Sequence, residues 1–218
     1  MDRLDRTEQR IVGVLIEKQL ALPDSYPMSE NALVDGCNQK TNRDPLMELA
    51  TFQVSGAAMA LQEKGWVARV EGGGRVPKFK HRTVEQLVQC SNKELAVLAE
   101  LLLRGQQAPG ALKPRVARMA YHASPEEIEA LLRGLAGRNL VEQMPQAPRE
   151  RDRRWRHLLG DGSELQNTPP ADPAEPRVAA ASVASQHAEL AQRVTKLEQQ
   201  MQILQRTISQ LAGPKMGD

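Results

Sequence analysis

Residues 66–71 read Trp-Val-Ala-Arg-Val-Glu and residues 75–82 read Arg-Val-Pro-Lys-Phe-Lys-His-Arg, with Gly72-Gly73-Gly74 between them. Apolar and polar residues alternate on both sides of the glycines, which is typical of two strands joined by a tight turn. Pro77 has no backbone N–H to give to a neighbouring strand, so it belongs at a sheet edge. This stretch therefore predicts a β-hairpin.

Three helices are predicted before the hairpin, because apolar residues recur there at helical spacing. They cover residues 7–19, 29–40 and 51–64. Thr7 is a candidate cap for the first helix, and Gly65 ends the third helix in the position where glycine is favoured. Three helices closed by a hairpin form a winged helix-turn-helix arrangement.

The same order then repeats at a period of roughly 75 to 85 residues. Helices are predicted over 92–104, 109–119 and 124–138, and a second hairpin follows over 140–159. Ser124-Pro125-Glu126-Glu127 has the composition of a capped helix start. We predict a mainly α fold with small β-hairpins, built from two tandem winged helix-turn-helix domains over residues 1–88 and 89–160.

A polar elbow, Cys37-Asn-Gln-Lys-Thr-Asn-Arg-Asp-Pro45, separates two helices that belong to the core of the first domain. Its side chains either bond the helix ends or face a ligand. Because the elbow precedes the third helix, Lys40, Asn42 and Arg43 could supply contacts to nucleic acid. The alternative is that its asparagines bond local backbone groups and shape the turn.

The elbow is also part of a set of motifs that resembles a known family. Glu17-Lys18-Gln19, Tyr26-Pro27, residues 37–43 and Leu101-Leu102-Leu103-Arg104-Gly105 resemble the YceH-like family of bacterial proteins. The resemblance covers roughly residues 5–160. It implies a pair of winged-helix domains, and it implies no mechanism.

The C-terminal part of the chain has a different character. Residues 161–182 are rich in proline and alanine, and they predict a linker. Residues 183–212 have apolar residues in heptads, which predicts a coiled-coil helix and a parallel homodimer. The expected dimer contacts are Leu190, Val194, Leu197, Met201, Leu204, Ile208 and Leu211. The alternative is a single amphipathic helix that packs on its own domains.

Composition argues against a single-stranded nucleic-acid binder, a disulfide-bonded protein and a membrane protein. Of the 218 residues 40% are hydrophobic but only 3% aromatic, so a surface that stacks single-stranded bases is not expected. Cys37 and Cys90 are far apart and flanked by apolar positions, which favours two free thiols in a reducing compartment. We find no 18-residue apolar run and no signal-peptide pattern at the start, so we expect a cytoplasmic protein without a membrane partner.

Catalytic patterns are weak in this sequence. His81, His122, His157 and His187 have no metal-ligand spacing to a cysteine or to one another. The three glycines lie between two strands, so they do not form a phosphate-binding loop. We therefore expect no enzymatic activity, no metal and no cofactor.

Basic residues in the two hairpins favour double-stranded DNA as a partner, because arginine and lysine neutralise phosphates. The first hairpin offers Arg75, Lys78, Lys80 and Arg82, and the second offers Arg151, Arg153 and Arg154. The third helix of each half has few base-reading side chains, and in the second half it begins with Glu126, Glu127 and Glu129.

Two functions remain open. The first is a regulator-like, DNA-binding protein that contacts duplex through its first domain and the basic hairpins. The second is a non-enzymatic adaptor that uses tandem winged helices to bind a protein partner. One continuous basic face across both hairpins would favour DNA, and hairpins on opposite sides would favour the adaptor.

Overall fold

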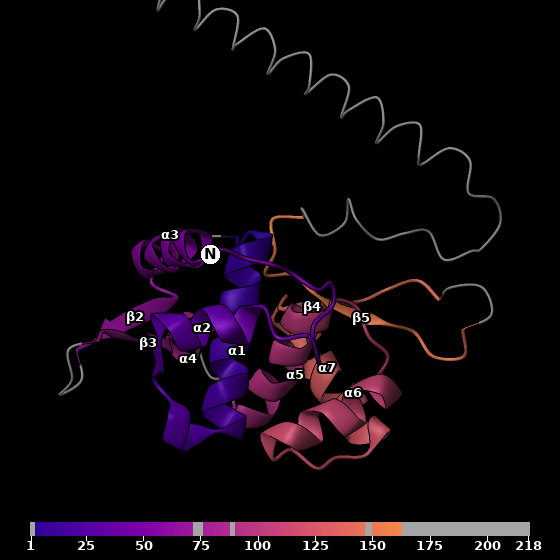
Figure 1. Ribbon diagram of the computed structural model, residues 1–218. Helices are drawn as coiled ribbons and strands as arrows, with labels where there is room; N and C mark the ends of the chain where they lie inside the picture. The colour runs from indigo at the N-terminus through magenta and orange to yellow at the C-terminus, as the bar shows by residue number, and fades with distance from the viewer. Residues whose placement is uncertain (1–2, 72–75, 88–89, 147–149, 163–218) are drawn as a thin grey trace, which may run out of the picture. The chain divides into compact units, whose positions relative to one another are not determined.

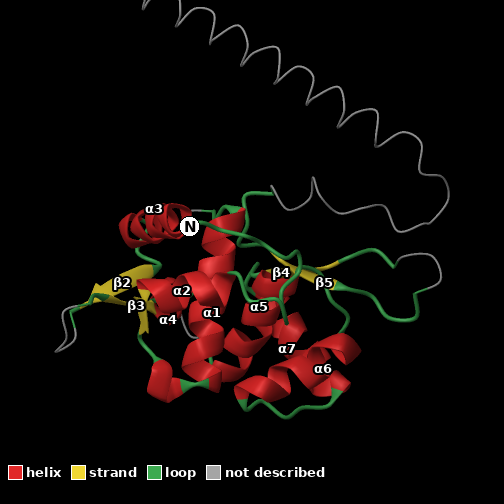
Figure 2. Ribbon diagram, viewed as in Figure 1, coloured by secondary structure: helices red, strands yellow, loops and turns green. Residues whose placement is uncertain are grey.

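The computed structural model describes residues 3–71, 76–87, 90–146 and 150–162 (Figure 1). These residues are mainly helical, with small antiparallel sheets (Figure 2). The predicted linker (161–182) lies almost wholly outside this part of the chain, and the predicted coiled-coil helix (183–212) lies entirely outside it. The dimer contacts expected between Leu190 and Leu211 are outside it as well, as is Arg75.

The first half begins with a helix and ends with the predicted hairpin. In chain order its elements are α1 (Arg6–Ala21), η1 (Pro23–Ser25), β1 (Met28–Ser29), α2 (Glu30–Cys37), α3 (Thr51–Glu63), β2 (Val67–Val70), β3 (Lys78–His81) and α4 (Thr83–Gln86). The strands form a sheet in the order β1-β3-β2, with Met28 opposite Phe79 and Val67 opposite His81. β1 has only two residues, too few for a visible alternation, and the sequence did not predict it.

The second half repeats the order of three helices and a two-stranded hairpin. Its elements are α5 (Asn92–Arg104), α6 (Pro109–Val116), η2 (Ala117–Met119), α7 (Pro125–Gly137), β4 (Val141–Gln143) and β5 (Trp155–His157). β4 pairs with β5, and Gln107 makes an isolated antiparallel bridge to Trp155. This bridge occupies the position that the β1–β3 pairing has in the first half. His157 is buried opposite Val141, as His81 is opposite Val67.

Capping side chains set the starts of the helices. Ser124 Oγ accepts from Glu127 N at 3.2 Å, and Glu127 Oε2 accepts from Ser124 N at 2.7 Å, as the sequence predicted. The first helix differs from the prediction, because its cap is Asp5 and not Thr7. Asp5 and Glu8 form a reciprocal pair of hydrogen bonds, each 2.8 Å long.

α1 and α5 pack against each other at the centre of this unit (Figure 1). A Cβ atom on Gly13 of α1 would lie 2.9 Å from Leu103 Cγ of α5, so the close approach requires glycine there. Leu4 pairs with Gly160, and its N–H donates to Leu159 O at 2.9 Å. The two halves therefore share one hydrophobic core.

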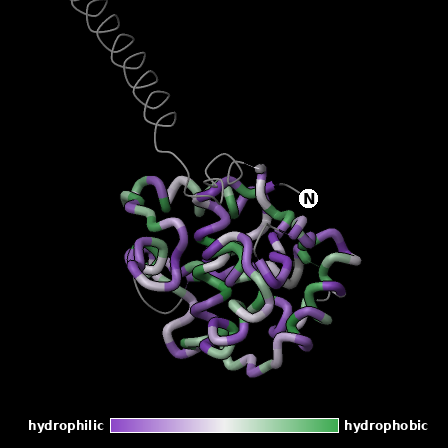
Figure 3. Tube along the Cα trace, turned by 90° about the vertical axis from the view of Figure 1, so that its right-hand side faces the viewer, coloured by the Kyte–Doolittle hydropathy of each residue, from purple (hydrophilic) through white to green (hydrophobic). Residues whose placement is uncertain are grey.

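Hydrophilic and hydrophobic residues are interleaved along the trace of the described unit (Figure 3). This pattern fits helices that bury one side and expose the other. Among the described helices, none combines the length and the apolar character that a membrane span requires.

Candidate functional site

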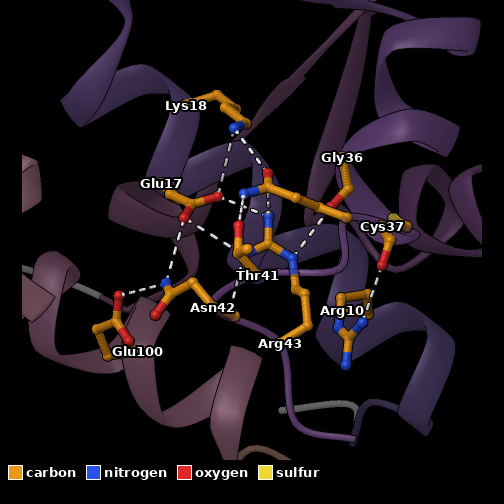
Figure 4. A network of polar contacts seen from close by, with 10 residues as sticks. Arg10, Glu17, Lys18, Gly36, Cys37, Thr41, Asn42, Arg43 and Glu100 are labelled. Carbon is orange, nitrogen blue, oxygen red and sulfur yellow. Dashed lines mark hydrogen bonds and ion pairs between the residues drawn. The ribbon is translucent and has the colours of Figure 1, made fainter. Parts of the chain in front are cut away.

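Polar side chains from α1, the elbow and α5 meet inside the unit (Figure 4). Arg43 Nη2 donates to Glu17 Oε2 at 2.7 Å, and the Arg43 side chain is fully buried. Asn42 Nδ2 donates to Glu100 Oε1 at 2.9 Å and to Glu17 Oε1 at 3.4 Å. The elbow thus connects α1 to α5 through a buried network of charged and amide groups.

The remaining donors of Arg43 also bond within the chain. Its Nε donates to Gly36 O at 3.0 Å, and its Nη1 donates to Asn42 O at 2.9 Å. A guanidinium group has no acceptor and needs partners for its N–H groups when it is buried. Arg43 is therefore held in one orientation by backbone carbonyls and one carboxylate.

Asn42 adopts a left-handed backbone conformation, with φ at 57°. Among residues with a side chain, asparagine visits this region most readily. The same conformation directs its amide to Glu100 and Glu17. Asparagine thus meets two requirements at position 42, a left-handed backbone conformation and an amide donor for the two carboxylates.

A second buried arginine fastens the two ends of the elbow. Arg10 Nη1 donates to Cys37 O at 2.9 Å, and its Nη2 donates to Pro45 O at 2.6 Å. Burial, together with the nearby charge of Arg43, lowers the pKa of Arg10 to about 10. Arg10 stays cationic at neutral pH. The elbow then reaches α5 through Asp44 N, which donates to Leu103 O at 3.0 Å.

Burial shifts the pKa of Glu100 and of Cys37. Burial raises the pKa of Glu100, and the charge of Glu17 raises it as well, against a lowering by the Asn42 hydrogen bond. Glu100 Oε2 is buried with no hydrogen-bond partner among the described residues. Burial also raises the pKa of Cys37 to about 12, so its thiol stays protonated and is no nucleophile.

These contacts change the interpretation of the elbow. Asn42 and Arg43, which the sequence offered as nucleic-acid contacts, are buried and bonded inside the unit, so we withdraw both as contacts. Lys40 is exposed. Asn38 exchanges two hydrogen bonds of 2.8 Å with the backbone of Leu49, which is the backbone-bonding alternative named above.

The first hairpin keeps its lysines at the surface. Lys78 and Lys80 are exposed, and Phe79 between them is buried, so both lysines lie on the face of β3 away from the core. Arg82 is exposed directly after the strand, and Arg69 is exposed on β2. Three of the four basic residues that the sequence offered as DNA contacts in this hairpin, Lys78, Lys80 and Arg82, are therefore exposed on and directly after β3.

The second hairpin places its charges differently. Arg154 pairs with Glu150 and Arg156 pairs with Glu142, so acidic partners offset part of the basic charge. Arg153 donates to Gln143 Oε1 at 3.3 Å, and Arg151 is exposed. The two hairpins lie on opposite sides of the described unit (Figure 1), so they do not form one continuous basic face.

Metal-ligating groups do not gather in the described part of the chain, where no three His, Cys, Asp or Glu side chains are placed to share an ion. His81 and His157 are buried at equivalent places in the two hairpins. Glu129 of the acidic α7 accepts from Trp155 Nε1 at 2.9 Å and pairs with Arg133 at 3.3 Å. These groups have structural partners.

Comparisons with known proteins identify the family of this chain. Residues 4–150 match the family described as "Protein of unknown function, DUF480". A "UPF0502 protein" of Saccharophagus degradans is 38% identical over 216 residues, which cover 96% of this chain and 97% of that relative. The chain belongs to the DUF480/UPF0502 family. This agrees with the YceH-like resemblance seen in the sequence.

Two further UPF0502 proteins show the same degree of similarity. The protein of Aeromonas hydrophila is 36% identical over 211 residues, covering 94% of this chain and 96% of the relative. The protein of Citrifermentans bemidjiense is 42% identical over 164 residues, covering 74% and 76%. None of these three names gives an activity, a substrate or a partner.

Sequence reasoning missed Arg10, Glu17 and Glu100 as members of the buried network. Glu17 is in the Glu17-Lys18-Gln19 motif that carried the YceH-like resemblance, together with the elbow. A polar motif on an otherwise apolar helix was the available signal that these segments meet. Glu100 gave no such signal, because a glutamate within a leucine-rich helix is ordinary on a solvated face.

Proposed function

We propose that each half of the chain is a winged-helix domain and that the first one binds double-stranded DNA in a regulator-like role. The sheet order β1-β3-β2 and the helix order of the first half support the winged-helix assignment. The Gln107–Trp155 bridge, which takes the place of the β1–β3 pairing, supports it for the second half. This assignment by itself does not fix a function.

The exposure of Lys78 and Lys80 on β3 carries the DNA proposal. Two lysines on the outward face of the central strand β3, followed by Arg82, can contact phosphates along a duplex backbone. α3 offers little to base edges, because three of its six exposed residues, Phe52, Gly56 and Met59, have no side-chain hydrogen-bonding group. The proposed contact is therefore with the backbone, it is made by the first hairpin, and it depends little on base sequence.

The second hairpin is left out of this contact. It lies on the opposite side of the unit from the first hairpin, and its Arg154 and Arg156 have acidic partners. A straight duplex that lies along β3 does not reach it. Arg151, Arg153 and Arg154 are therefore no longer among the proposed DNA contacts.

The test is binding of a random-sequence duplex by the full chain across a salt series. Binding should weaken linearly with the logarithm of salt concentration. Lys78→Ala with Lys80→Ala should lower affinity at low salt and reduce the slope by about 2, because each lysine neutralises one phosphate. Lys113→Ala with Arg118→Ala removes the same charge from exposed positions in the second half and should change little. Equal effects of the two double variants would sink the proposal.

A second candidate function is the adaptor that binds a protein partner. The opposite placement of the hairpins and the exposed apolar residues of α3 favour it. It predicts that the full chain does not bind duplex even at low salt. The same titration therefore decides between the two functions.

A further inference from the structure

The outward face of α3 carries an apolar stripe that no described residue covers. Phe52 is 76% exposed and Met59 is 63% exposed. Gly56 and Glu63 are exposed as well, and the spacing of these positions places all of them on one face of the helix. The opposite face holds Val54, Ala58 and Leu61 in the core. Large apolar side chains grouped in this way mark an interaction surface.

Gly56 is not explained by the packing of the unit itself. A Cβ atom built there would meet nothing within 4 Å among the described residues, so no described segment requires the glycine. Glycine within a helix costs about 0.5 to 1 kcal/mol relative to alanine. It leaves a notch in the stripe between Phe52 and Met59, where another backbone or side chain can approach closely.

We propose that α3 is a self-association surface, on which α3 of a second copy of this chain packs in antiparallel orientation. Gly56 and Met59 are equally far from the midpoint of residues 52–63, and so are Phe52 and Glu63. One two-fold axis at that midpoint therefore places Met59 of each copy in the Gly56 notch of the other. A surface that repeats itself under a two-fold rotation is what an isologous dimer requires.

Charge complementarity supports the same register. The two-fold axis brings Glu63 of one copy to the first turn of α3 in the other, near Phe52. That turn begins after Ala50, whose side chain has no acceptor for the free N–H groups, and a carboxylate is favoured at a helix N-terminus. Residues 51–62 carry no charge, so the pairing opposes no like charges along the rest of the helix.

The size of the contact sets its strength. A single helix pair buries less than the roughly 1,200 Å² of a stable interface, so this contact alone gives weak association. Phe52 and Met59 would be its anchors, because large side chains in a desolvated centre dominate such contacts. The surface is separate from the proposed DNA contact on β3, and neither proposal depends on the other.

The first experiment is disulfide trapping in the full chain. Chains with Gly56→Cys are mixed with chains of distinguishable mass that carry Met59→Cys, and the mixture is oxidised mildly. Cys37 and Cys90 are buried and do not compete. Mixed disulfides between the two variants should outnumber both homodisulfides by about tenfold, because only the mixed pair is adjacent in this register. Yields equal to those of a Gly134→Cys and Arg133→Cys mixture, on exposed positions of α7, would overturn the proposal.

The second experiment fills the notch. Gly56→Leu in the full chain should weaken self-association about tenfold in sedimentation equilibrium, because the added side chain occupies the place of Met59 from the other copy. The first atom of the new side chain meets no described neighbour within 4 Å, Gly56 is exposed, and leucine is a better helix former than glycine. Gly134→Leu is the matched control, since Gly134 is an exposed helical glycine with nothing within 4 Å of its built Cβ. Equal association constants for the two variants would contradict the proposal.

Discussion

The two halves of the unit repeat one order of elements but place their charged side chains in different surroundings. The first half buries Arg43 against Glu17 and leaves Lys78 and Lys80 exposed. Among its described residues the second half has no counterpart of the elbow, and its arginines Arg154 and Arg156 pair at the surface. A repeated backbone thus fixes where strands and helices lie, and it does not fix which charges serve packing and which remain for a partner.

The largest effect is expected when the buried guanidinium of the first half is removed. Arg43→Ala removes the 2.7 Å partner of the buried Glu17 carboxylate and leaves it only the Lys18 ammonium at 3.7 Å and the Asn42 amide at 3.4 Å, which should cost about 3 to 5 kcal/mol in the free energy of unfolding. Urea denaturation followed by circular dichroism measures the change. A loss below about 1 kcal/mol would mean that water reaches Glu17 and that the network is not closed.

The next largest effect is expected at Asn42. Asn42→Ala removes a hydrogen bond to a buried carboxylate and places alanine at a φ of 57°, so it should cost about 3 kcal/mol. Asn42→Gly accepts the same φ and should cost about 1 kcal/mol less. The two variants separate the contact from the turn in one denaturation series. Equal losses would show that the backbone conformation contributes nothing.

A smaller effect, which depends on pH, is expected at Glu100. Burial raises its pKa in the folded state, so its contribution to stability is complete below the ordinary value of 4.5 and is lost as the pH rises through the raised pKa. Glu100→Gln keeps an oxygen for Asn42 and removes this titration. The variant should be more stable than the wild type at neutral pH, by on the order of 1 kcal/mol. The difference should vanish near pH 4, and a difference independent of pH would contradict the assignment.

The smallest effect on stability is expected at a surface ion pair of the second half. Arg156→Ala removes a surface pair with Glu142, whose side chain is 40% exposed, and should cost less than about 1 kcal/mol. The loss should shrink further in 1 M salt, which screens exposed pairs. Chemical denaturation in low and high salt tests both statements. A loss as large as that of Arg43→Ala would remove the contrast between the halves.

The sequence predicted the regular elements well, because periodic burial is a local property. The third helix was expected over 51–64 and is α3, Thr51–Glu63, and alternation around the glycines gave β2 and β3. The repeat of the order in the second half was visible for the same reason. The helix expected over 29–40 ends earlier, at Cys37, because the elbow bonds its amides to other segments.

The elbow contacts could not be derived in this way. Glu17 lies 26 residues from Arg43, and Glu100 lies 58 residues from Asn42. No periodic pattern connects positions so far apart, and a polar run looks the same whether it faces solvent or a buried carboxylate. The exposure of Phe52 and Met59 on α3 could not be predicted either, because large apolar residues of a helix are usually buried.

The close contact between Gly13 of α1 and Leu103 of α5 has a consequence for biosynthesis. A ribosome adds about 5 to 20 residues per second, so α1 waits on the order of 5 to 20 s before its neighbour in the core exists. During that interval the emerging first half cannot bury the face of α1 around Gly13. Completion of its core is therefore tied to synthesis of the second half, and the nascent chain presents an apolar helix face to chaperones for that time.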